Sequence, residues 1–363
     1  MFDFGLSEEL ELLVRTAREL AQAELAPQLR AAEAARELDA RVHAAYASIG
    51  LLGLELPTGL GGAGLGPLAR VLINEELAAA DAGAAIALDR LGPALAALLE
   101  LGGEAALSEH MLPLLAQPDA RAVLVSTDDA RFAIEPQRIS GELAWVPANR
   151  VDLLVVLDHD AAVVVREGIE VAPVLGTGLR AAGGCALSLR GASIAARYQG
   201  AAAARRALAR GRLYNTALLL GVLRQAADYS RSYALERVAF GKPIAHHQAL
   251  AFLITDMRAG VDGARLLLHE AAFRAERGLD FEAAAAAAAV EAIELSRVVG
   301  PAGVQILGGH GFMQDHPVEK YMREARALGL LLAGVDGARE HAGAAVAASS
   351  LPVELSAIAE GEV

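Results

Sequence analysis

The sequence predicts a mostly α-helical protein with a small central β domain. Three observations favour this fold class. First, 54% of the 363 residues are hydrophobic but only 4% are aromatic, so alanine and leucine, the best helix formers, supply the apolar side chains. Second, apolar residues recur at helical spacing toward both ends of the chain. Third, short valine-rich runs bounded by Asp, Gly and Pro are confined to the middle of the chain, where they are typical of strands.

Residues 1–117 form the first predicted domain, which is helical. Its first helix carries apolar residues at helical spacing, with charged residues between them: Leu10, Leu13, Val14, Ala17 and Leu20. Pro27, Pro57 and the glycine-rich run 59–66 interrupt the pattern, because proline and glycine end helices and begin turns. Several helices joined by a glycine-rich loop are therefore expected.

Residues 118–200 form the second predicted domain, which is a shortened β domain. Its runs are short, rich in valine and separated by residues that favour turns. The expected strands are at residues 122–127, 139–146, 152–157 and 161–171. The pattern predicts a small sheet between two helical domains.

Residues 201–363 return to helical patterns and predict a C-terminal four-helix bundle. The expected helices run from Ala203 to Arg237, from Leu250 to Arg277 and from Phe281 to Leu307, and a fourth follows Pro317. These long helices, and residues 281–299 above all, are too apolar for a solitary bundle. We therefore expect a homo- or hetero-oligomer with a total buried area above about 1,600 Å², the standard interface size.

The charge and the cysteine content exclude several function classes. A net charge of −13 argues against nucleic acid or an anionic membrane as a partner. Cys185 is the only cysteine, so an intramolecular disulfide is impossible, as is usual in a reducing compartment. The acidic start of the chain is unlike a signal peptide, and no apolar run suits membrane insertion. A cytoplasmic protein without a metal site is expected.

Two segments carry residues suited to a dinucleotide. In RVAFGKPIAHHQ, residues 237–248, Arg237 offers a planar fork of donors for a pyrophosphate, while Phe240 and Gln248 suit an adenine or a ribose. In QILGGHGFMQDHPVEKYMREAR, residues 305–326, glycines follow a helical pattern, and their N–H groups suit a phosphate or an adenosine edge. Either segment alone is also compatible with an ordinary surface turn.

Together these segments closely resemble the C-terminal domain of acyl-CoA dehydrogenases, with about 57 residues between them. Residues 7–27 and 50–81 resemble the opening helices and glycine-rich loop of the same family. The resemblance implies FAD as cofactor, acyl-CoA thioesters as substrates in fatty acid or steroid side-chain β-oxidation, and electron-transfer flavoprotein as electron acceptor. It also implies a set of contacts to the ADP half of FAD bound to a neighbouring subunit, from Arg237, Phe240, His247, Gln248, Gln305, Gly308 and Gly309.

The middle of the chain departs from the family pattern. Residues 125–130, VSTDDA, resemble the family's threonine-acid-proline stretch, but the Gly-Ser-Asp turn that follows it in the family has no counterpart. Trp145 resembles the family tryptophan beside the flavin ring. Pro147 stands where the family has a hydroxyl residue, and proline offers neither a hydroxyl nor an N–H. The flavin-covering part of this chain is therefore expected to be eroded.

The catalytic base of the family also lacks a counterpart. The alignment places the usual glutamate at Leu332, or at Ala333 with a one-residue shift, and the base of a minority of members at Gly211. None of these side chains accepts a proton. Asp336 and Glu340 are the nearest downstream carboxylates and remain as candidates. Arg212 matches a position that faces the thioester end of the ligand in the family.

Several functions remain open at this point. A chain that lacks both the base and part of the flavin-covering domain resembles the smaller, non-catalytic subunits of heteromeric acyl-CoA dehydrogenases. In those enzymes a partner subunit supplies the base. The alternatives are a self-sufficient dehydrogenase with an unrecognised base, a flavin monooxygenase-like enzyme, and a non-enzymatic relative on the same fold. Flavin content of the purified protein, alone and with a partner, separates these hypotheses.

Overall fold

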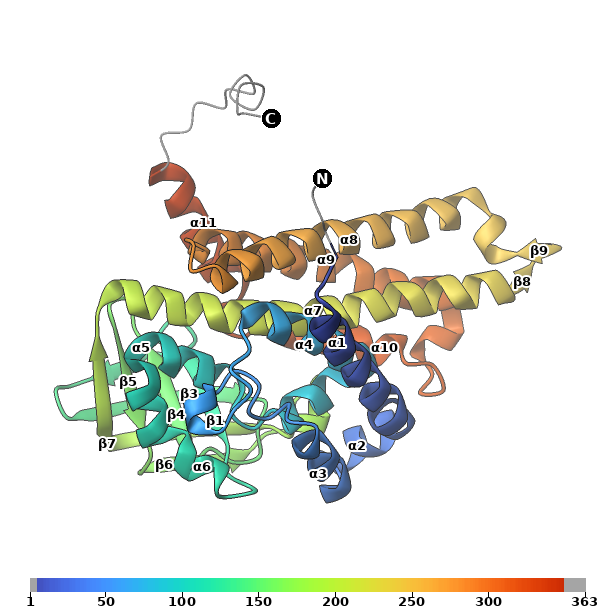
Figure 1. Ribbon diagram of the computed structural model, residues 1–363. Coiled ribbons are helices and arrows are strands. Elements are labelled where there is room, and N and C mark those ends of the chain that lie inside the picture. The colour runs from blue at the N-terminus through green and yellow to red at the C-terminus, as the bar shows by residue number, and fades with distance from the viewer. Residues whose placement is uncertain (1–4, 349–363) are drawn as a thin grey trace.

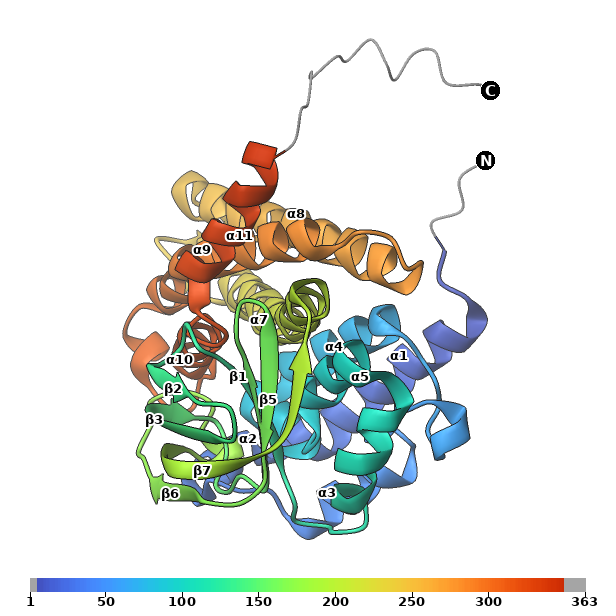
Figure 2. The same cartoon turned by 90° about the vertical axis from the view of Figure 1, so that its left-hand side faces the viewer.

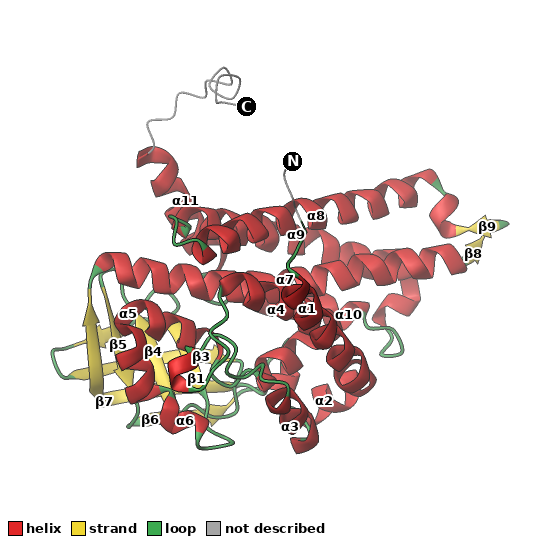
Figure 3. Ribbon diagram, viewed as in Figure 1, coloured by secondary structure: helices red, strands yellow, loops and turns green. Residues whose placement is uncertain are grey.

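A computed structural model describes residues 5–348 of the chain, and it confirms the predicted fold class. Figure 1 shows helices at both ends of the sequence and a small sheet between them, and Figure 3 separates the two kinds of structure by colour. The N-terminal part contains the helices α1 (Glu8–Leu20), α2 (Leu29–Ala35), α3 (Ala40–Ser48), α4 (Pro67–Leu88), α5 (Gly92–His110) and α6 (Leu112–Leu115).

Local sequence explains how the first helices begin. The Ser7 hydroxyl caps α1 by accepting a hydrogen bond from the Leu10 N–H at 3.3 Å, and three glutamates occupy the first turn of that helix. Pro67 stands at the first position of α4, where its missing N–H costs no hydrogen bond. A π-helical turn, Ala21–Leu25, and a short 3₁₀ turn, Ala26–Gln28, follow α1 directly.

The middle of the chain is a seven-stranded sheet. Its strands are β1 (Ala122–Ser126), β2 (Phe132–Ile134), β3 (Arg138–Val146), β4 (Leu153–Leu157), β5 (Ala161–Val165), β6 (Ile169–Pro173) and β7 (Cys185–Gln199). They lie in the order β1-β4-β5-β7-β3-β2, and β6 also pairs with β7. Only β1 and β4 run parallel to one another.

Two features of the sheet differ from the sequence-based expectation. Residues 161–171 form two strands, β5 and β6, because the turn around Gly168 (φ 75°) separates them. The long strand β7 contains no valine, which is why the valine-based criterion does not predict it. Its pairing with β3, β5 and β6 makes β7 the centre of the sheet (Figure 2).

The C-terminal part contains the expected long helices and one more. The helices are α7 (Ala201–Glu236), α8 (Gln248–Glu276), α9 (Glu282–Leu307), α10 (Val318–Leu328) and the additional α11 (Gly334–Ala348). A small hairpin of β8 (Val238–Ala239) and β9 (Lys242–Pro243) joins α7 to α8 and projects from the far end of the bundle (Figure 1). The 3₁₀ turns Ile244–His246 and Gly308–Phe312 lie at the same end.

The alanine-rich part of α9 is buried within the chain itself. Its small side chains let α9 pack closely against α7 and α8, and the fully or nearly fully buried members are Ala285, Ala286, Ala288, Ala289 and Ala292. Exposed apolar residues lie instead on α8, where Phe252, Leu266 and Phe273 are 60%, 71% and 46% exposed. The outer face of α8 is therefore an apolar surface that suits a second subunit.

No single helix among the described residues is long and apolar enough to cross a membrane. Only α4 and α5 taken together, across a 63° bend, meet that requirement of length and composition.

Candidate functional site

A cavity of about 340 Å³ lies between the sheet, the first half of α7 and the loop after α10. This size is within the range of small-molecule sites. Its walls are mostly apolar and come from β1, β3, residues 330–332 and the turn between α4 and α5. The polar side chains that line it are Asp89, Arg121, Asp129, Tyr214 and Asn215. Such a mixture suits a largely apolar ligand held by a few polar groups.

Two of the positions expected to carry the family base, Leu332 and Gly211, meet one another beside this cavity. Leu332 is buried and lines the cavity, and Gly211 lies on the facing side of α7. A Cβ atom on Gly211 would lie 2.5 Å from Leu332 Cδ1 and 2.9 Å from Leu124 Cδ2. The leucine side chain therefore occupies the space above the glycine, and neither residue can take up a proton.

The other carboxylates named from the sequence lie elsewhere. Asp336 and Glu340 are both exposed on α11 and do not belong to the cavity wall. Asp129, which the sequence analysis does not single out, is in that wall. Its carboxylate accepts hydrogen bonds from the backbone N–H of Ala333 at 2.6 Å and of Ser126 at 2.8 Å. Burial raises the pKa of Asp129, although these two bonds oppose the shift.

Asp129 holds a turn with an unusual backbone. Leu332, Ala333 and Gly334 all have positive φ angles, of 53°, 67° and 56°. A left-handed conformation costs a residue other than glycine about 1–2 kcal/mol. The bond from Ala333 N–H to Asp129, together with the packing of Leu332 over Gly211, opposes that cost. The contact joins residues 204 positions apart, so no local sequence signal identifies it.

Arg212 lies behind Leu332 and outside the main cavity. It lines a separate space of about 20 Å³, and Asn215, Leu331 and Leu332 line both spaces. Its side chain is buried, and Nη2 lies 3.1 Å from Nδ1 of His341. Burial lowers the pKa of Arg212 to about 10, and its Nε has no hydrogen-bond partner among the described residues. The expected contact of Arg212 with a thioester stays a prediction.

Trp145 and Pro147 both line the main cavity, on β3 and just after it. Glycines make room for the indole, since a Cβ on Gly176 or Gly184 would lie 3.0 or 2.9 Å from Trp145 Nε1. That nitrogen is buried without a hydrogen-bond partner in residues 5–348. A buried donor without an acceptor carries a desolvation cost of about 1–3 kcal/mol, which a bound ligand atom can relieve.

The predicted ADP-binding residues lie at the opposite end of α7. From Tyr214 in the cavity wall to Arg237 the helix extends about 35 Å, at 1.5 Å per residue. Phe240 is 96% exposed at the tip of the β8–β9 hairpin and has a φ of 53°. The remaining exposed members are Arg237, Gln248, Gln305, Gly308 and Gly309. His247 is partly buried, and its Nε2 lies 3.2 Å from the Ala239 carbonyl oxygen.

The two segments predicted to bind ADP share one end of the bundle, where α7 and α9 end and α8 begins (Figure 1). A hydrogen bond of 2.7 Å between Tyr233 Oη and His310 Nδ1 links the end of α7 to the glycine turn. Added Cβ atoms at Gly308 and Gly309 would meet nothing within 4 Å, so open space borders both glycines. Within the described residues, no cluster of three His, Cys, Asp or Glu side chains suits a metal ion.

Comparison with known proteins adds independent observations. The family model described as "Acyl-CoA dehydrogenase, N-terminal domain" matches residues 7–119, and "Acyl-CoA dehydrogenase, C-terminal domain" matches residues 198–349. Among curated proteins, the chain is similar to the mitochondrial short/branched chain specific acyl-CoA dehydrogenase of Bos taurus. The two are 26% identical over 348 residues, which cover 87% of this chain and 81% of the relative.

Solved structures agree in fold. Butyryl-CoA dehydrogenase from Megasphaera elsdenii has a TM-score of 0.83 at 22% identity, covering 95% of this chain and 100% of that one. The FAD complex of PigA has a TM-score of 0.83 at 19% identity, covering 95% and 99%. Residues 120–197, which include most of the sheet, lie outside both matched family models. Because the two models account for both helical ends, the chain belongs to the acyl-CoA dehydrogenase family of FAD-dependent oxidoreductases that act on CH–CH bonds.

Proposed function

We propose that this chain completes the FAD site of a partner acyl-CoA dehydrogenase subunit and does not itself supply the base for α,β-dehydrogenation of acyl-CoA thioesters. One contrast carries the proposal. Leu332 packs over Gly211 where a carboxylate is needed, whereas the residues suited to the ADP half of FAD are exposed around open space. The half of the site that serves a neighbour is retained, and the half that serves this chain's own flavin is altered.

The exposed end of the bundle fits an ADP group contributed by another subunit. Arg237 would bind the pyrophosphate through its guanidinium, and Phe240 and Gln248 would contact the adenosine. Gln305, Gly308 and Gly309 would let the nucleotide approach the backbone at the end of α9. His247 would hold the hairpin through the Ala239 carbonyl oxygen. PigA, which shares this fold, forms a complex with FAD, and this supports the same cofactor here.

The cavity of this chain fits a flavin ring less well. Trp145 offers an indole and an unpaired N–H, but Pro147 offers neither a hydroxyl nor an N–H to a ring edge. A bound flavin supplies the acceptor for the β-hydride. This chain's residues would then enclose an apolar acyl group and exclude water, without removing the α proton.

A partner subunit is required by this proposal. The exposed apolar face of α8 suits packing against another bundle of the same family, either a second copy or a related subunit. Electron-transfer flavoprotein is the family-implied electron acceptor. Light scattering of the chain co-purified with its partner is expected to give an oligomer. A monomer at micromolar concentration, both for the chain alone and for the co-purified sample, contradicts this arrangement.

Replacing Arg237 by Ala tests the shared FAD site. The variant loses a charge-assisted contact to pyrophosphate, so FAD binding by the assembled complex is expected to weaken by about 1.5–3 kcal/mol. Arg231→Ala, an exposed arginine earlier on α7, is the matched control and should leave binding unchanged. The readout is the fraction of FAD retained after gel filtration. Equal retention by Arg237→Ala and the control rules out the pyrophosphate contact.

Asp129 supports a second candidate function, a self-sufficient dehydrogenase. Among the described carboxylates, Asp129 lines the cavity next to the turn that carries Leu332, and burial raises its pKa toward the range of a general base. In that case the isolated chain is active, and Asp129→Asn abolishes turnover; its amide oxygen still accepts the Ala333 N–H, and only the bond from Ser126 is lost. Inactivity of the unaltered chain excludes this candidate.

A further inference from the structure

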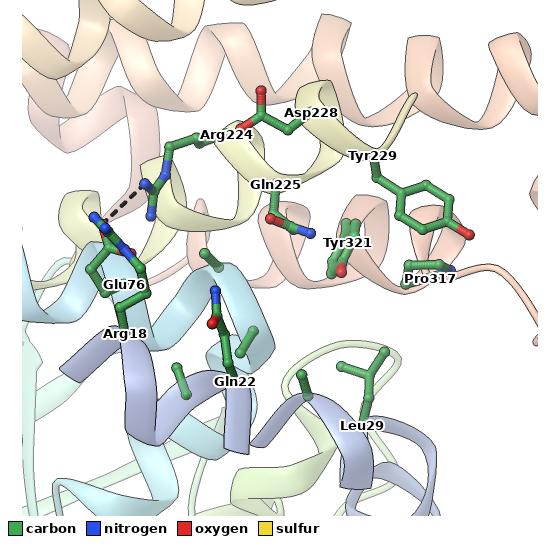
Figure 4. Close-up of a pocket in the computed structure, with 14 residues that line it drawn as sticks. Arg18, Gln22, Leu29, Glu76, Arg224, Gln225, Asp228, Tyr229, Pro317 and Tyr321 are labelled. Atoms are coloured by element: carbon green, nitrogen blue, oxygen red, sulfur yellow. Dashed lines mark hydrogen bonds and ion pairs between the residues drawn. The ribbon is translucent and has the colours of Figure 1, made fainter. Parts of the chain in front are cut away.

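A second cavity, of about 370 Å³, lies between the N-terminal helices and the bundle (Figure 4). Its walls come from α1 and the π-helical turn on one side, from α4, and from α7 and α10 on the other. Among the described residues, none lines both this cavity and the one beside Leu332. The proposed dehydrogenase function makes no use of it, although its size also suits a small molecule.

One end of this cavity is ionic. Arg18 Nε lies 2.9 Å from Glu76 Oε2, and Arg224 Nη1 lies 3.0 Å from Glu76 Oε1, so two guanidinium groups share a single carboxylate. The other carboxylate in the wall, Asp228, lies 2.9 Å from Arg258, which also pairs with Asp262 at 2.9 Å. Arg224 Nε is buried, and no described residue accepts its hydrogen bond. This end therefore keeps a buried guanidinium N–H for which a bound anion would be an acceptor.

The other end is apolar and contains rings. Tyr229, Tyr321 and Pro317 lie together there, away from the Arg18–Glu76–Arg224 group (Figure 4). The Tyr229 hydroxyl is 2.8 Å from His316 Nδ1, and Tyr321 is hydrogen-bonded to Gln225, so both hydroxyls already have partners. What remains for a ligand is ring surface and a wall of small side chains, namely Ala21, Ala26, Ala79 and Ala80.

The backbone next to this cavity is also unusual. Residues Ala21–Leu25 form a π-helical turn at the end of α1. Such turns are rare in proteins as a whole, but those that occur are frequently found at functional sites. This turn contributes Ala21 and Gln22 to the wall. In Figure 4 the Gln22 amide extends from this turn toward α7, between the ionic end and the ring end. It adds one neutral hydrogen-bonding group at the middle of the cavity.

We propose that this cavity binds a small organic anion with a flat, apolar body, such as an aromatic carboxylate. The carboxylate would complete the Arg18–Glu76–Arg224 group, since arginine binds carboxylates through paired N–H donors. The body of the ligand would lie over the alanines and against the tyrosine rings, where stacking and apolar burial favour it. The anion and the ring surface are both needed for binding.

Calorimetric titration of the purified full-length chain with benzoate tests the proposal. Benzoate is expected to bind at one site, and neutral benzamide at least about tenfold more weakly, because it cannot make the charge-assisted bonds. Inorganic phosphate, which has the charge but no ring, should bind more weakly than benzoate. Raising the salt concentration should weaken benzoate binding as the charges are screened.

Two variants separate the charge from the shape. Arg18→Gln removes one of the two guanidinium groups and should weaken benzoate binding about tenfold or more. Ala80→Leu fills the wall without changing charge and should prevent binding. Arg15→Gln, an exposed α1 arginine outside the cavity wall, is the control. Arg18 is exposed and Ala80 is partly exposed, so melting temperatures are expected to stay close to that of the unaltered chain.

The outcomes distinguish this proposal from the dehydrogenase proposal. Loss of benzoate binding in both variants, with FAD retention by the assembled complex unchanged, supports the second site. Absence of benzoate binding, equal binding of benzamide, or undiminished binding in Arg18→Gln and Ala80→Leu overturns it. None of these results depends on whether the chain dehydrogenates acyl-CoA.

Discussion

Replacing Lys320 by Met is expected to lower the free energy of unfolding by about 3–5 kcal/mol, the cost of removing one partner from a buried ion pair. Lys320 is completely buried on α10, and its Nζ lies 3.0 Å from Asp81 Oδ1 and also contacts the Glu324 carboxylate. One oxygen of each carboxylate, Asp81 Oδ2 and Glu324 Oε2, already has no hydrogen-bond partner in the described chain. The variant would leave two buried carboxylates with no cation between them.

The loss of stability in this variant should depend on pH. Burial, aided by the Asp81 charge, raises the pKa of Glu324 from 4.5 to about 7, while Lys320 opposes the rise. A carboxyl whose folded pKa is raised contributes stability below its unfolded pKa, and this contribution is lost as the pH rises through the folded value. Removing Lys320 raises the pKa of Glu324 further. The variant should therefore lose less stability at pH 5 than at pH 8.

Urea unfolding followed by circular dichroism at both pH values measures this effect. Arg297→Met is the control, because it removes only an exposed pair with Glu294 at 3.1 Å, which is worth about 0–1 kcal/mol. A loss below about 1 kcal/mol for Lys320→Met at pH 8 would contradict the stabilising role of Lys320.

The isolated chain is expected to dehydrogenate acyl-CoA about 10²–10⁴-fold more slowly than an assembly that contains a base, which is the usual contribution of a general base. Leu332 and Gly211 cannot accept the α proton, and the exposed Asp336 and Glu340 lie outside the cavity wall. The decisive quantity is turnover by the isolated chain.

Restoring a carboxylate at one position is expected to recover little activity. Leu332→Glu leaves Pro147 unchanged, and proline offers neither a hydroxyl nor an N–H to hold a flavin ring. Gly211→Glu introduces a Cβ 2.5 Å from Leu332 Cδ1, which forces either α7 or the turn to move. Dye-coupled assays of both variants, with Leu332→Gln as an uncharged control, measure the gain. Recovery to the rate of the assembled complex by Leu332→Glu alone contradicts this interpretation.

The sequence predicts the helices well and the contacts between distant residues poorly. The limits of α7 and α9 differ from the predicted ones by no more than two residues, because glycine, proline and apolar periodicity mark helix ends locally. The strand β7 is not predicted, since its pairing with three other strands outweighs the weak strand propensity of its alanines. Tertiary pairing therefore decides the structure of the middle domain.

The candidate site shows the same limit. The alignment with family motifs selects Leu332 and Gly211, but only the folded chain reveals that the two residues touch. The bond from Ala333 to Asp129 and the pair formed by Lys320 and Asp81 join residues 204 and 239 positions apart. A pattern that is read along a short window carries no information about such pairs, whereas burial and charge in the folded state identify them directly.

Reduction of an artificial electron acceptor by the purified chain, across short, medium, long and steroid-like acyl-CoA thioesters, tests the central claim most directly. The chain is assayed with added FAD, alone and co-purified with an acyl-CoA dehydrogenase subunit that carries the base glutamate. We predict negligible turnover by the chain alone and turnover only in the assembled complex. Robust turnover by the chain alone, abolished in Asp129→Asn, would contradict the proposed role and identify Asp129 as the base.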